Sequence, residues 1–301
     1  MTDDQYTLQD PTKMFSDITP TAQYQEGSGL DANLKDKADR GEDTYRGSGR
    51  LTGRKALVTG GDSGIGAAVA IAFGARGMRV AVHYNQSAEP AQAVVDTIVK
   101  AGGDAFALQG DVRDTTAIAR IVRETRARLG GIDVLVNNAG SLVKRAPIAE
   151  FDDALFDEVM HINARSMLAF CREVVPLMRE RGNGGCIINV SSVAARNGGG
   201  PGAYLYAGSK GFVSTATHGL AKELAPDGIR VNAVAPGVIQ TPFQDRFSTP
   251  ALLESFRASI PMGRIGDPDD CTGAFLYLAS QQLSGYVTGQ VIEVNGGQYM
   301  P

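Results

Sequence analysis

The stretch that decides the fold is ALVTGGDSGIG, residues 56–66. It begins with a short apolar run typical of a buried strand, and the helix-forming run 67–73 follows its last glycine at once. Such a turn can bind a phosphate group. Gly60 permits a tight turn, Gly64 lets an anion approach the backbone without a Cβ clash, and Gly66 lets the helix pack closely on the strand. The stretch therefore predicts a strand, a pyrophosphate-binding turn and a helix; an ordinary βα turn is the alternative.

From Lys55 onward, short apolar runs alternate with longer helical patterns, which is typical of repeated βαβ units. The pattern predicts strands at 56–59, 79–83, 105–109, 134–136, 186–190, 231–234 and 291–294. It predicts helices at 66–76, 89–101, 115–129, 152–181, 206–224 and 268–278. Right-handed crossovers then give an α/β fold with one Rossmann-type, doubly wound, seven-stranded parallel sheet and helices on both faces.

Composition excludes several classes of protein. Of the 301 residues, 43% are hydrophobic and 21% are charged, which fits a globular chain with a sizeable core. A net charge of -4 argues against a nucleic-acid partner. The three cysteines form no disulfide framework or CxxC pair and are expected to be small buried hydrophobes. The three histidines have no metal-ligand spacing, so we expect no metal site.

The first 50 residues differ from the rest of the chain. They carry ten acidic and six basic residues and lack apolar periodicity. We expect a polar extension over 1–50, extended or partly disordered, and one catalytic domain over 51–301. The start of the chain has no basic region followed by an apolar segment, and no apolar run is long enough to cross a bilayer. We therefore expect a cytoplasmic protein with no membrane partner.

The end of the second strand bears on the choice of dinucleotide. An NAD-binding unit usually places an acidic residue there to hold the ribose 2′-hydroxyl, whereas this chain reads HYNQS, residues 83–87. A carboxylate would repel a 2′-phosphate, so its absence favours NADP(H), with Asn85 and Ser87 as possible donors; NAD(H) remains possible. Tyr84 flanks this position.

The next two strands end in polar residues at the edge where open α/β sheets bind ligands. Asp111 follows the third strand, where it could accept a hydrogen bond from an adenine amino group or cap the helix near Thr115. NNAG, residues 137–140, follows the fourth strand. Asn137 or Asn138 could tie strand ends together, and the two small residues after them could let a ribose lie close.

A tyrosine and a lysine stand together at the head of the helix predicted at 206–224. Tyr206 and Lys210 are four residues apart and so share a helical face, whereas Tyr204 has Gly208 at that spacing. A nearby ammonium favours the phenolate, and lowering a tyrosine pKa from about 10 toward 7 needs about 4 kcal/mol. Tyr206 is therefore the better candidate acid. A surface Tyr and Lys without a role is the alternative.

Taken together, these motifs resemble the short-chain dehydrogenase/reductase family. TGxxxGxG at 59–66, NNAG at 137–140, Ser192, the YxxxK motif at 206–210 and PG at 236–237 stand in the family's order. The resemblance covers about residues 51–299 and is strongest to 3-oxoacyl carrier-protein reductases, glucose dehydrogenases and NADP-dependent aldehyde or carbonyl reductases. The extension resembles a bacterial branch with N-terminal extensions. The resemblance implies a homotetramer or homodimer, and hydride transfer between NAD(P)H and a carbonyl or secondary alcohol.

The resemblance also implies roles for particular residues. Tyr206 is the general acid in reduction and the base in oxidation, and Lys210 lowers the pKa of Tyr206 and holds the nicotinamide ribose. Ser192 hydrogen-bonds the substrate oxygen, with Ser191 as the alternative because the interval to Tyr206 is one residue longer than is common. Asn163 completes a water-linked proton relay to Lys210.

The loop after the sixth strand resembles the family's nicotinamide-side loop. There Ile239 and Thr241 hold the carboxamide, and residues 243–262 form a mobile lid over the substrate. The expected cofactor contacts are Gly60, Ser63, Gly64, Ile65, Gly66, Tyr84, Asn85, Asp111, Val112, Asn138, Ala139, Gly140, Tyr206, Lys210, Pro236, Gly237, Ile239 and Thr241. The sequence thus predicts an NADP(H)-preferring carbonyl reductase or alcohol dehydrogenase. An NAD-dependent sugar or polyol dehydrogenase and a non-catalytic dinucleotide-sensing protein are the alternatives.

Overall fold

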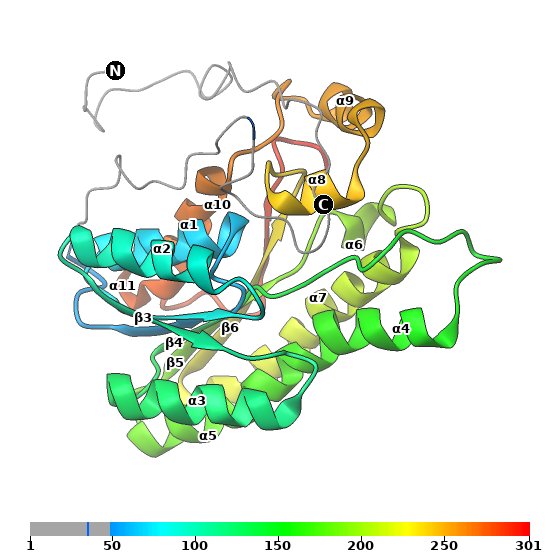
Figure 1. Cartoon of the computed structure of the whole chain (residues 1–301). Helices are drawn as coiled ribbons and strands as arrows, with labels where there is room; N and C mark the ends of the chain where they lie inside the picture. Colours follow the sequence, from blue (N-terminus) through cyan, green and yellow to red (C-terminus); the bar gives the residue numbers. More distant parts are fainter. Residues whose placement is uncertain (1–34, 36–48) are drawn as a thin grey trace.

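Seven parallel strands form one sheet in the computed structural model, which describes residue 35 and residues 49–301 (Figure 1). The order of the strands is β3-β2-β1-β4-β5-β6-β7. Their bounds are β1 Lys55–Val58, β2 Arg79–Tyr84, β3 Asp104–Gln109, β4 Val134–Asn137, β5 Gly185–Val190, β6 Ile229–Pro236 and β7 Val291–Val294. All seven predicted strands are confirmed, and the predicted fold class is correct.

The order of the strands positions the functional site. The chain runs outward from β1 through β2 to β3, then returns to pair β4 on the other side of β1. The connections after β1 and β4 therefore leave the sheet in opposite directions, which opens a crevice at the carboxyl ends of these strands. The glycine-rich turn follows β1, so it lies at this crevice.

Helices cover both faces of the sheet (Figure 1). The main ones are α1 Gly64–Ala75, α2 Ala88–Lys100, α3 Thr115–Leu129, α4 Asp153–Met160, α5 Ser166–Arg181, α7 Tyr204–Leu224 and α10 Pro268–Ala279. The helices α1, α2 and α10 lie on one face, and α3, α5 and α7 lie on the other. Alternate residues of β1 serve the two cores: Ala56 and Val58 pack with the first group and Leu57 with the second.

Several short helices and a π-helical turn were not expected from the sequence. The short helices that shape the site are α6 Ala194–Asn197, α8 Pro242–Phe247 and α9 Pro250–Ser259, and α11 Gln281–Ser284 follows α10. The single helix predicted at 152–181 is wrong in detail, because the π-helix His161–Arg165 separates α4 from α5. Such π-turns are often found at functional sites.

Most of the predicted extension, including its expected extended or disordered character, lies outside the described residues. Among the helices of the described residues, none combines the length and the apolar character that crossing a membrane requires. The three cysteines are free and buried, as expected. Cys171 packs in the core beside α3, α5 and α7, whereas Cys186 and Cys271 pack in the core on the opposite face.

Candidate active site

A cavity of about 710 Å³ lies at the carboxyl edge of the sheet and reaches from the glycine-rich turn to α8 and α9. Sixteen of the expected cofactor contacts line it, and so do Ser191 and Ser192. The sixteen are Gly60, Ser63, Gly64, Ile65, Asn85, Asp111, Val112, Asn138, Ala139, Gly140, Tyr206, Lys210, Pro236, Gly237, Ile239 and Thr241. Three expected site residues, Gly66, Tyr84 and Asn163, are not part of the lining.

The glycine-rich turn is packed too tightly for side chains. Gly60 and Gly64 have φ angles of 59° and 49°, in the left-handed region. A Cβ on Gly64 would lie 2.8 Å from Thr241 Cγ2, and one on Gly66 would lie 2.0 Å from the Gly60 carbonyl oxygen. The role expected for Gly66 is thus confirmed as close packing. Helix α1 begins at Gly64, and the side chain of its N-cap Ser63 makes no capping hydrogen bond. Its first N–H groups are therefore suited to an anion at the cavity.

The two asparagines after β4 hold strand ends together. Asn138 Nδ2 donates to the carbonyl oxygens of Thr59 at 2.9 Å and Gly60 at 2.8 Å. Asn137 Nδ2 donates to Asn189 Oδ1 on β5 at 2.9 Å. Both residues therefore tie strand ends, and the amide nitrogen of Asn138 is already used by the turn, which leaves Asn138 a structural role at the cavity wall.

His83 is a site residue that the sequence analysis did not single out within β2. It is 1% exposed; its Nδ1 accepts from the Gly60 N–H at 3.2 Å, and its Nε2 lies 2.9 Å from the Gly110 carbonyl oxygen. These two contacts require a neutral ring that donates from Nε2. Burial lowers its pKa to about 4, which keeps that form at neutral pH. His83 thus links the glycine-rich turn to the end of β3.

The cavity wall at the end of β2 is formed by neutral side chains. Asn85, Gln86 and Ser87 line it, whereas Tyr84 does not. Asp62, in the glycine-rich turn, also lines the cavity, which the sequence analysis did not consider. The expected neutral surface is therefore present at this strand end, with a carboxylate elsewhere in the wall.

Asp111 is held in an ion pair. Arg113 Nη2 lies 2.6 Å from Asp111 Oδ2, and Arg113 Nη1 lies 2.9 Å from Glu158 Oε1 on α4. The hydrogen bonds from Arg113 hold the pKa of Asp111 below its usual value. The alternative role for Asp111 as a helix cap is wrong, because Asp114 caps α3 by accepting from the Thr116 N–H. Arg113 itself lines the cavity and was missed from the sequence.

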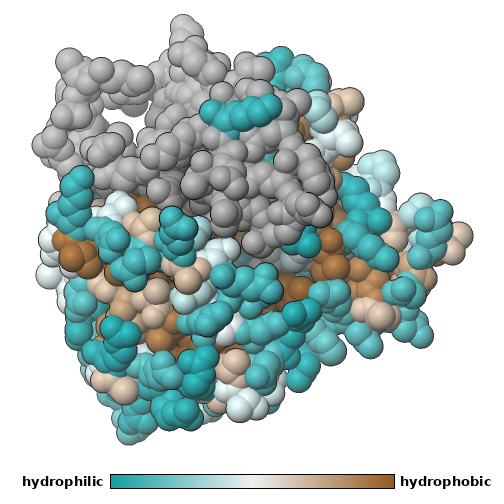
Figure 2. Space-filling model, viewed as in Figure 1, coloured by the Kyte–Doolittle hydropathy of each residue, from teal (hydrophilic) through white to brown (hydrophobic). Residues whose placement is uncertain are grey.

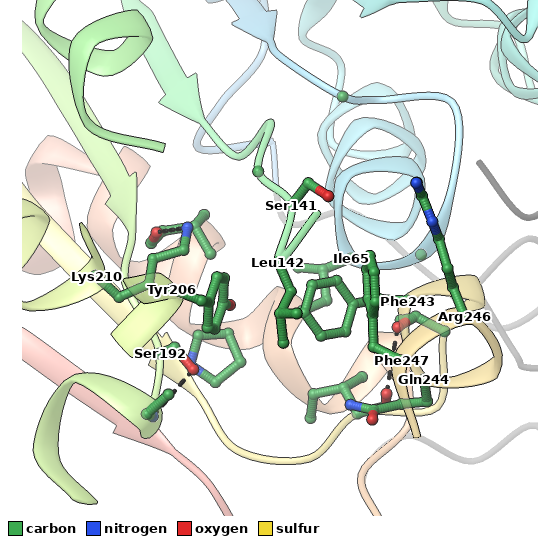
Figure 3. Close-up of a pocket in the computed structure, with 18 of the residues that line it drawn as sticks. Ile65, Ser141, Leu142, Ser192, Tyr206, Lys210, Phe243, Gln244, Arg246 and Phe247 are labelled. Carbon is green, nitrogen blue, oxygen red and sulfur yellow. Dashed lines mark hydrogen bonds between the residues drawn. The ribbon is translucent and has the colours of Figure 1, made fainter. Parts of the chain in front are cut away.

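Ser192, Tyr206 and Lys210 meet at one end of the cavity (Figure 3). Lys210 Nζ donates to the Val190 carbonyl oxygen at 2.8 Å and lies 5.7 Å from the centre of the Tyr206 ring. Ser192 Oγ accepts from the Ala194 N–H at 3.1 Å and lines the cavity together with Tyr206. Ser191 is tied to the Lys210 carbonyl oxygen and to the Ser214 hydroxyl, which favours Ser192 over Ser191 as the substrate contact.

The Tyr206 pKa is raised rather than lowered in this structure. Burial raises the pKa of Tyr206 to about 12, and the nearby Ser192 hydroxyl offsets this only in part. Burial also lowers the pKa of Lys210 to about 8. Lys210 Nζ lies over the face of the Tyr206 ring and donates to a backbone oxygen. The raised pKa of Tyr206 therefore reflects its desolvation rather than the charge of Lys210. Tyr206 is consequently protonated at neutral pH.

The positions of Asn163 and Tyr204 bear on the roles expected for the site residues. Asn163 lies behind the cavity wall in the π-helix, 2% exposed, and its Oδ1 accepts from the Ser141 N–H at 2.9 Å. A Cβ on Gly140 would lie 2.8 Å from Asn163 Oδ1 and 3.1 Å from Lys210 Nζ, so the two polar groups flank the same glycine. Tyr204 is not part of the lining, and its ring packs against Phe151. This agrees with the choice of Tyr206.

The segment expected to form the lid, residues 243–262, contains most of α8 and all of α9. The Phe243 ring on α8 lies 5.5 Å from the Tyr206 ring and 4.8 Å from the Phe247 ring, centre to centre. Figure 3 shows these rings facing the reactive end of the cavity beside Leu142. These aromatic side chains make the cavity wall beside the Tyr206 ring apolar.

The chain matches a family model over residues 60–298, and that model is described as Enoyl-(Acyl carrier protein) reductase. YghA of Escherichia coli K12, an uncharacterized oxidoreductase, is 39% identical over 297 residues, which cover 97% of this chain and 99% of YghA. That alignment includes most of the extension, in agreement with the expected bacterial branch.

Two solved structures are also similar. The NADH-dependent reductase A1-R′ complexed with NAD is 35% identical, with a TM-score of 0.75 over 84% of this chain and 99% of that one. A short-chain dehydrogenase from Burkholderia cenocepacia J2315 in complex with NADP is 33% identical, with a TM-score of 0.77 over 83% and 99%. Sequence, fold and site geometry agree, and the chain belongs to the short-chain dehydrogenase/reductase family as an NAD(P)-dependent oxidoreductase.

Proposed function

We propose that this protein is an NADP(H)-preferring reductase of aldehydes or ketones, with Tyr206 as its general acid. The observation that carries the proposal is the meeting of Ser192, Tyr206 and Lys210 at one end of a cavity whose other end is the glycine-rich turn. Two hydroxyl groups side by side can hydrogen-bond one carbonyl oxygen. Such an arrangement stabilises the negative charge that develops on that oxygen as the carbonyl is reduced.

The residues at the glycine-rich turn fit a dinucleotide. The α1 N-terminus offers N–H groups to the pyrophosphate, and the turn has no room for side chains that would cover them. Asn138 lines the cavity beside the turn, and Gly140 lines it close to Lys210. A bound nicotinamide nucleotide supplies the hydride. The remaining chemistry is proton transfer, which this chain's own side chains perform.

The raised pKa of Tyr206 suits the reductive direction. A phenol with a pKa of about 12 holds its proton at neutral pH, so Tyr206 can donate it to the carbonyl oxygen. Ser192 orients that oxygen by a second hydrogen bond. Lys210 and Asn163 lie on either side of Gly140, and we assign them the return of a proton to Tyr206 through water. The oxidative direction needs a phenolate, which desolvation of the Tyr206 hydroxyl disfavours.

The preference for NADP(H) rests on the end of β2. Asn85, Gln86 and Ser87 line the cavity there without a carboxylate, so a 2′-phosphate meets neutral donors at this strand end. The carboxylate of Asp62, in the turn, repels a 2′-phosphate that lies near it and so opposes the preference for NADP(H). A binding titration measures the net preference that results.

The first experiment titrates the purified protein with NADPH and with NADH, followed by nicotinamide fluorescence. We expect tighter binding of NADPH. A screen with aldehydes, ketones, 3-oxoacyl esters and an enoyl thioester then identifies the reacting group, and reduction of the enoyl thioester alone would contradict carbonyl reduction. Binding of neither nucleotide would overturn the cofactor assignment.

The tyrosine assignment is tested with Tyr206→Phe and its matched control Tyr204→Phe on the same helix. We expect the first variant to lose about a thousandfold in turnover while its affinity for NADPH stays within about threefold of wild type. Tyr204 lies off the cavity, so its variant should keep wild-type turnover. Unchanged turnover in Tyr206→Phe would show that the phenol is not the acid.

We also propose that the protein assembles as a homotetramer, with α4, α5 and α7 in one of its interfaces. Phe156, Leu168 and Phe212, on these three helices, are 45%, 39% and 38% exposed. Figure 2 shows hydrophobic residues, in brown, among hydrophilic ones over α4. Light scattering should give the mass of four chains, and Phe156→Glu should lower it; a monomer at micromolar concentration would contradict the proposal.

A further inference from the structure

One charged side chain in the cavity has no part in the proposed proton transfer. Arg145 lies in the loop after β4 and lines the cavity near α8 and α9. Its Nε donates to the Phe247 carbonyl oxygen at 2.7 Å, and its Nη1 donates to the Pro201 carbonyl oxygen at 2.8 Å. The guanidinium therefore joins the last residue of α8 to the loop that precedes α7. Two backbone groups fix its position, and neither of them uses Nη2.

The positive charge of Arg145 is not balanced within the described part of the chain, where no carboxylate lies within ion-pair distance of it. Two other partly buried arginines are paired with carboxylates, Arg264 with Asp270 and Arg181 with Asp133, whereas Arg230 donates to neutral oxygens of Ser284, Val287 and Leu278. Burial alone lowers the pKa of Arg145, with no carboxylate nearby to raise it. Taking a charge out of water is unfavourable unless a partner of opposite charge is present. An anion in the cavity would provide that partner.

The surroundings of Arg145 are shaped closely around it. A Cβ on Gly202 would lie 3.1 Å from Arg145 Cβ, and one on Gly200 would lie 3.3 Å from Nη1 and 3.5 Å from the Phe256 ring. Val143, two residues before Arg145, has a φ of 68°, which is a strained conformation for a β-branched residue. Strained backbone of this kind is found where a site needs a particular geometry. The loop therefore holds the guanidinium in one place at the cavity wall.

We propose that Arg145 is a specificity-determining residue that binds a carboxylate at the end of the substrate remote from its carbonyl group. The inference rests on the proposed carbonyl reductase function and names its substrate class, the oxo acids. The guanidinium donates to backbone oxygens from Nε and Nη1, and its remaining N–H groups suit a planar carboxylate. The aromatic rings of Phe243, Phe247 and Phe256 line the same cavity and suit the apolar carbons between the two ends of such a substrate.

Arg246 is a useful comparison. It also lines the cavity, lies 5.0 Å from the centre of the Phe247 ring, and in Figure 3 stands beyond Ile65, on the far side of Phe243 from Tyr206. It thus points toward the glycine-rich turn, where a dinucleotide phosphate fits. Arg145 instead lies beside Pro201 and Gly202, close to the start of the helix that carries Tyr206. We therefore expect substitutions of Arg145 and of Arg246 to affect the choice of substrate differently.

The test compares oxo acids with their methyl esters, which share the carbonyl and differ in charge. The panel is 4-oxobutanoate, 5-oxopentanoate and 6-oxohexanoate with the three esters, assayed with NADPH. For at least one chain length, we expect the wild type to reduce the acid at least about tenfold more efficiently than its ester, measured as kcat/KM. Arg145→Gln should abolish that ratio and leave the ester within about threefold of wild type, and Arg145→Lys should restore part of it.

Two controls separate this role from others. Lys144→Gln removes an exposed charge from the neighbouring position, and Arg246→Gln removes another arginine of the cavity wall; both should keep the wild-type ratio. If Arg145→Gln lowers acid and ester equally, Arg145 only fastens α8 and the inference is overturned. Loss of the ratio in Arg246→Gln instead would place the anion elsewhere and would also overturn it.

A binding measurement distinguishes failure of this inference from failure of the proposed function. If the wild type reduces none of the six compounds, the NADPH-bound protein is heated with pentanedioate or with its dimethyl ester. We expect the diacid to raise the Tm of the wild type and of Lys144→Gln, but not that of Arg145→Gln. The same shift in all three proteins would overturn the anion site, whereas an arginine-dependent shift without turnover would leave the site and refute the proposed reaction.

Discussion

The two ends of the cavity are built in different ways. At the glycine-rich turn, positions are set by backbone atoms and short neutral side chains: Gly66 against the Gly60 carbonyl oxygen, and the Asn138 amide on the same turn. At the other end, they are set by long side chains and irregular backbone, as in the loop that carries Arg145 and Val143. The first arrangement tolerates little change and suits a ligand common to a large family. The second can be altered residue by residue, as differing substrates require.

Among the variants that test this difference between the two ends of the cavity, we expect the largest effect from Gly66→Ala. Its Cβ would lie 2.0 Å from the Gly60 carbonyl oxygen and 2.4 Å from Asn138 Nδ2, so the turn must move. We expect a loss of about 3 kcal/mol in the free energy of unfolding and no measurable binding of NADPH, by urea denaturation and fluorescence titration. Gly219→Ala, in open space on α7, should instead stabilise the protein by about 0.5 kcal/mol. A tolerated Gly66→Ala would contradict the rigidity assigned to the turn.

The next effect concerns the buried charge of Lys210. Its pKa is lowered from 10.5 to about 8 by burial, so between these values the unfolded chain holds a proton that the folded chain lacks. Stability contributed by this group therefore rises as the pH rises through that range. We expect the free energy of unfolding of wild type, relative to Lys210→Met, to increase on the order of 2 kcal/mol between pH 7.5 and 10.

The matched control for this pH effect is Lys222→Met, which alters an exposed lysine on the same helix. Its free energy of unfolding should follow that of the wild type across the same pH range. A constant difference between wild type and Lys210→Met would mean that the Lys210 pKa is not lowered in the folded protein.

An effect of similar size is expected at His83, and it tests whether the turn depends on neutral hydrogen bonds. His83→Leu leaves the Gly60 N–H and the Gly110 carbonyl oxygen without their partner and should cost about 2 kcal/mol of stability. His83→Gln, which offers a donor and an acceptor, should recover part of the loss. Substituting the exposed His218 by leucine should have no such effect. Urea denaturation at pH 7 measures all three; equal stability of the His83→Leu variant and the wild type would refute the link.

The smallest effect is expected from Asn85→Asp at the end of β2. A carboxylate there repels a 2′-phosphate and can accept from a 2′-hydroxyl. We expect the ratio of NADPH to NADH affinity to fall about tenfold, with stability unchanged, whereas Asn197→Asp at the other end of the cavity should leave the ratio unaltered. An unchanged ratio in Asn85→Asp would show that β2 does not select the nucleotide.

The sequence predicted those features that depend on a local pattern or on a single residue type. A strand followed by glycines and a helix needs only local pattern, and all seven strands were located in this way. Gly60 and Gly64 could be assigned because positive φ angles favour glycine strongly. The YxxxK spacing placed Tyr206 and Lys210 on one helical face, and the structure brings both into the cavity with Ser192.

What the sequence did not predict depends on contacts between distant segments. Nothing near Arg145 in the chain indicates that its partners are 56 and 102 residues away. His83 can bond the residues that follow β1 and β3 because these strands lie on either side of β2. The position of His83 in an apolar strand gave no indication of this role. The pKa of Tyr206 was expected to fall because a lysine is near in sequence, but desolvation by α8 and its neighbours determines the direction.

The three buried cysteines can serve as chemical probes of local opening in the folded protein. A thiol reacts as the thiolate, and burial raises the pKa of Cys171 to about 12 and that of Cys186 to about 11. A maleimide in solution therefore labels these side chains only when the surrounding core opens. Cys171 reports the α3, α5 and α7 side of the sheet, and Cys271 reports the α10 side. Unequal labelling rates would mean that the two faces of one sheet come apart separately, before the whole chain unfolds.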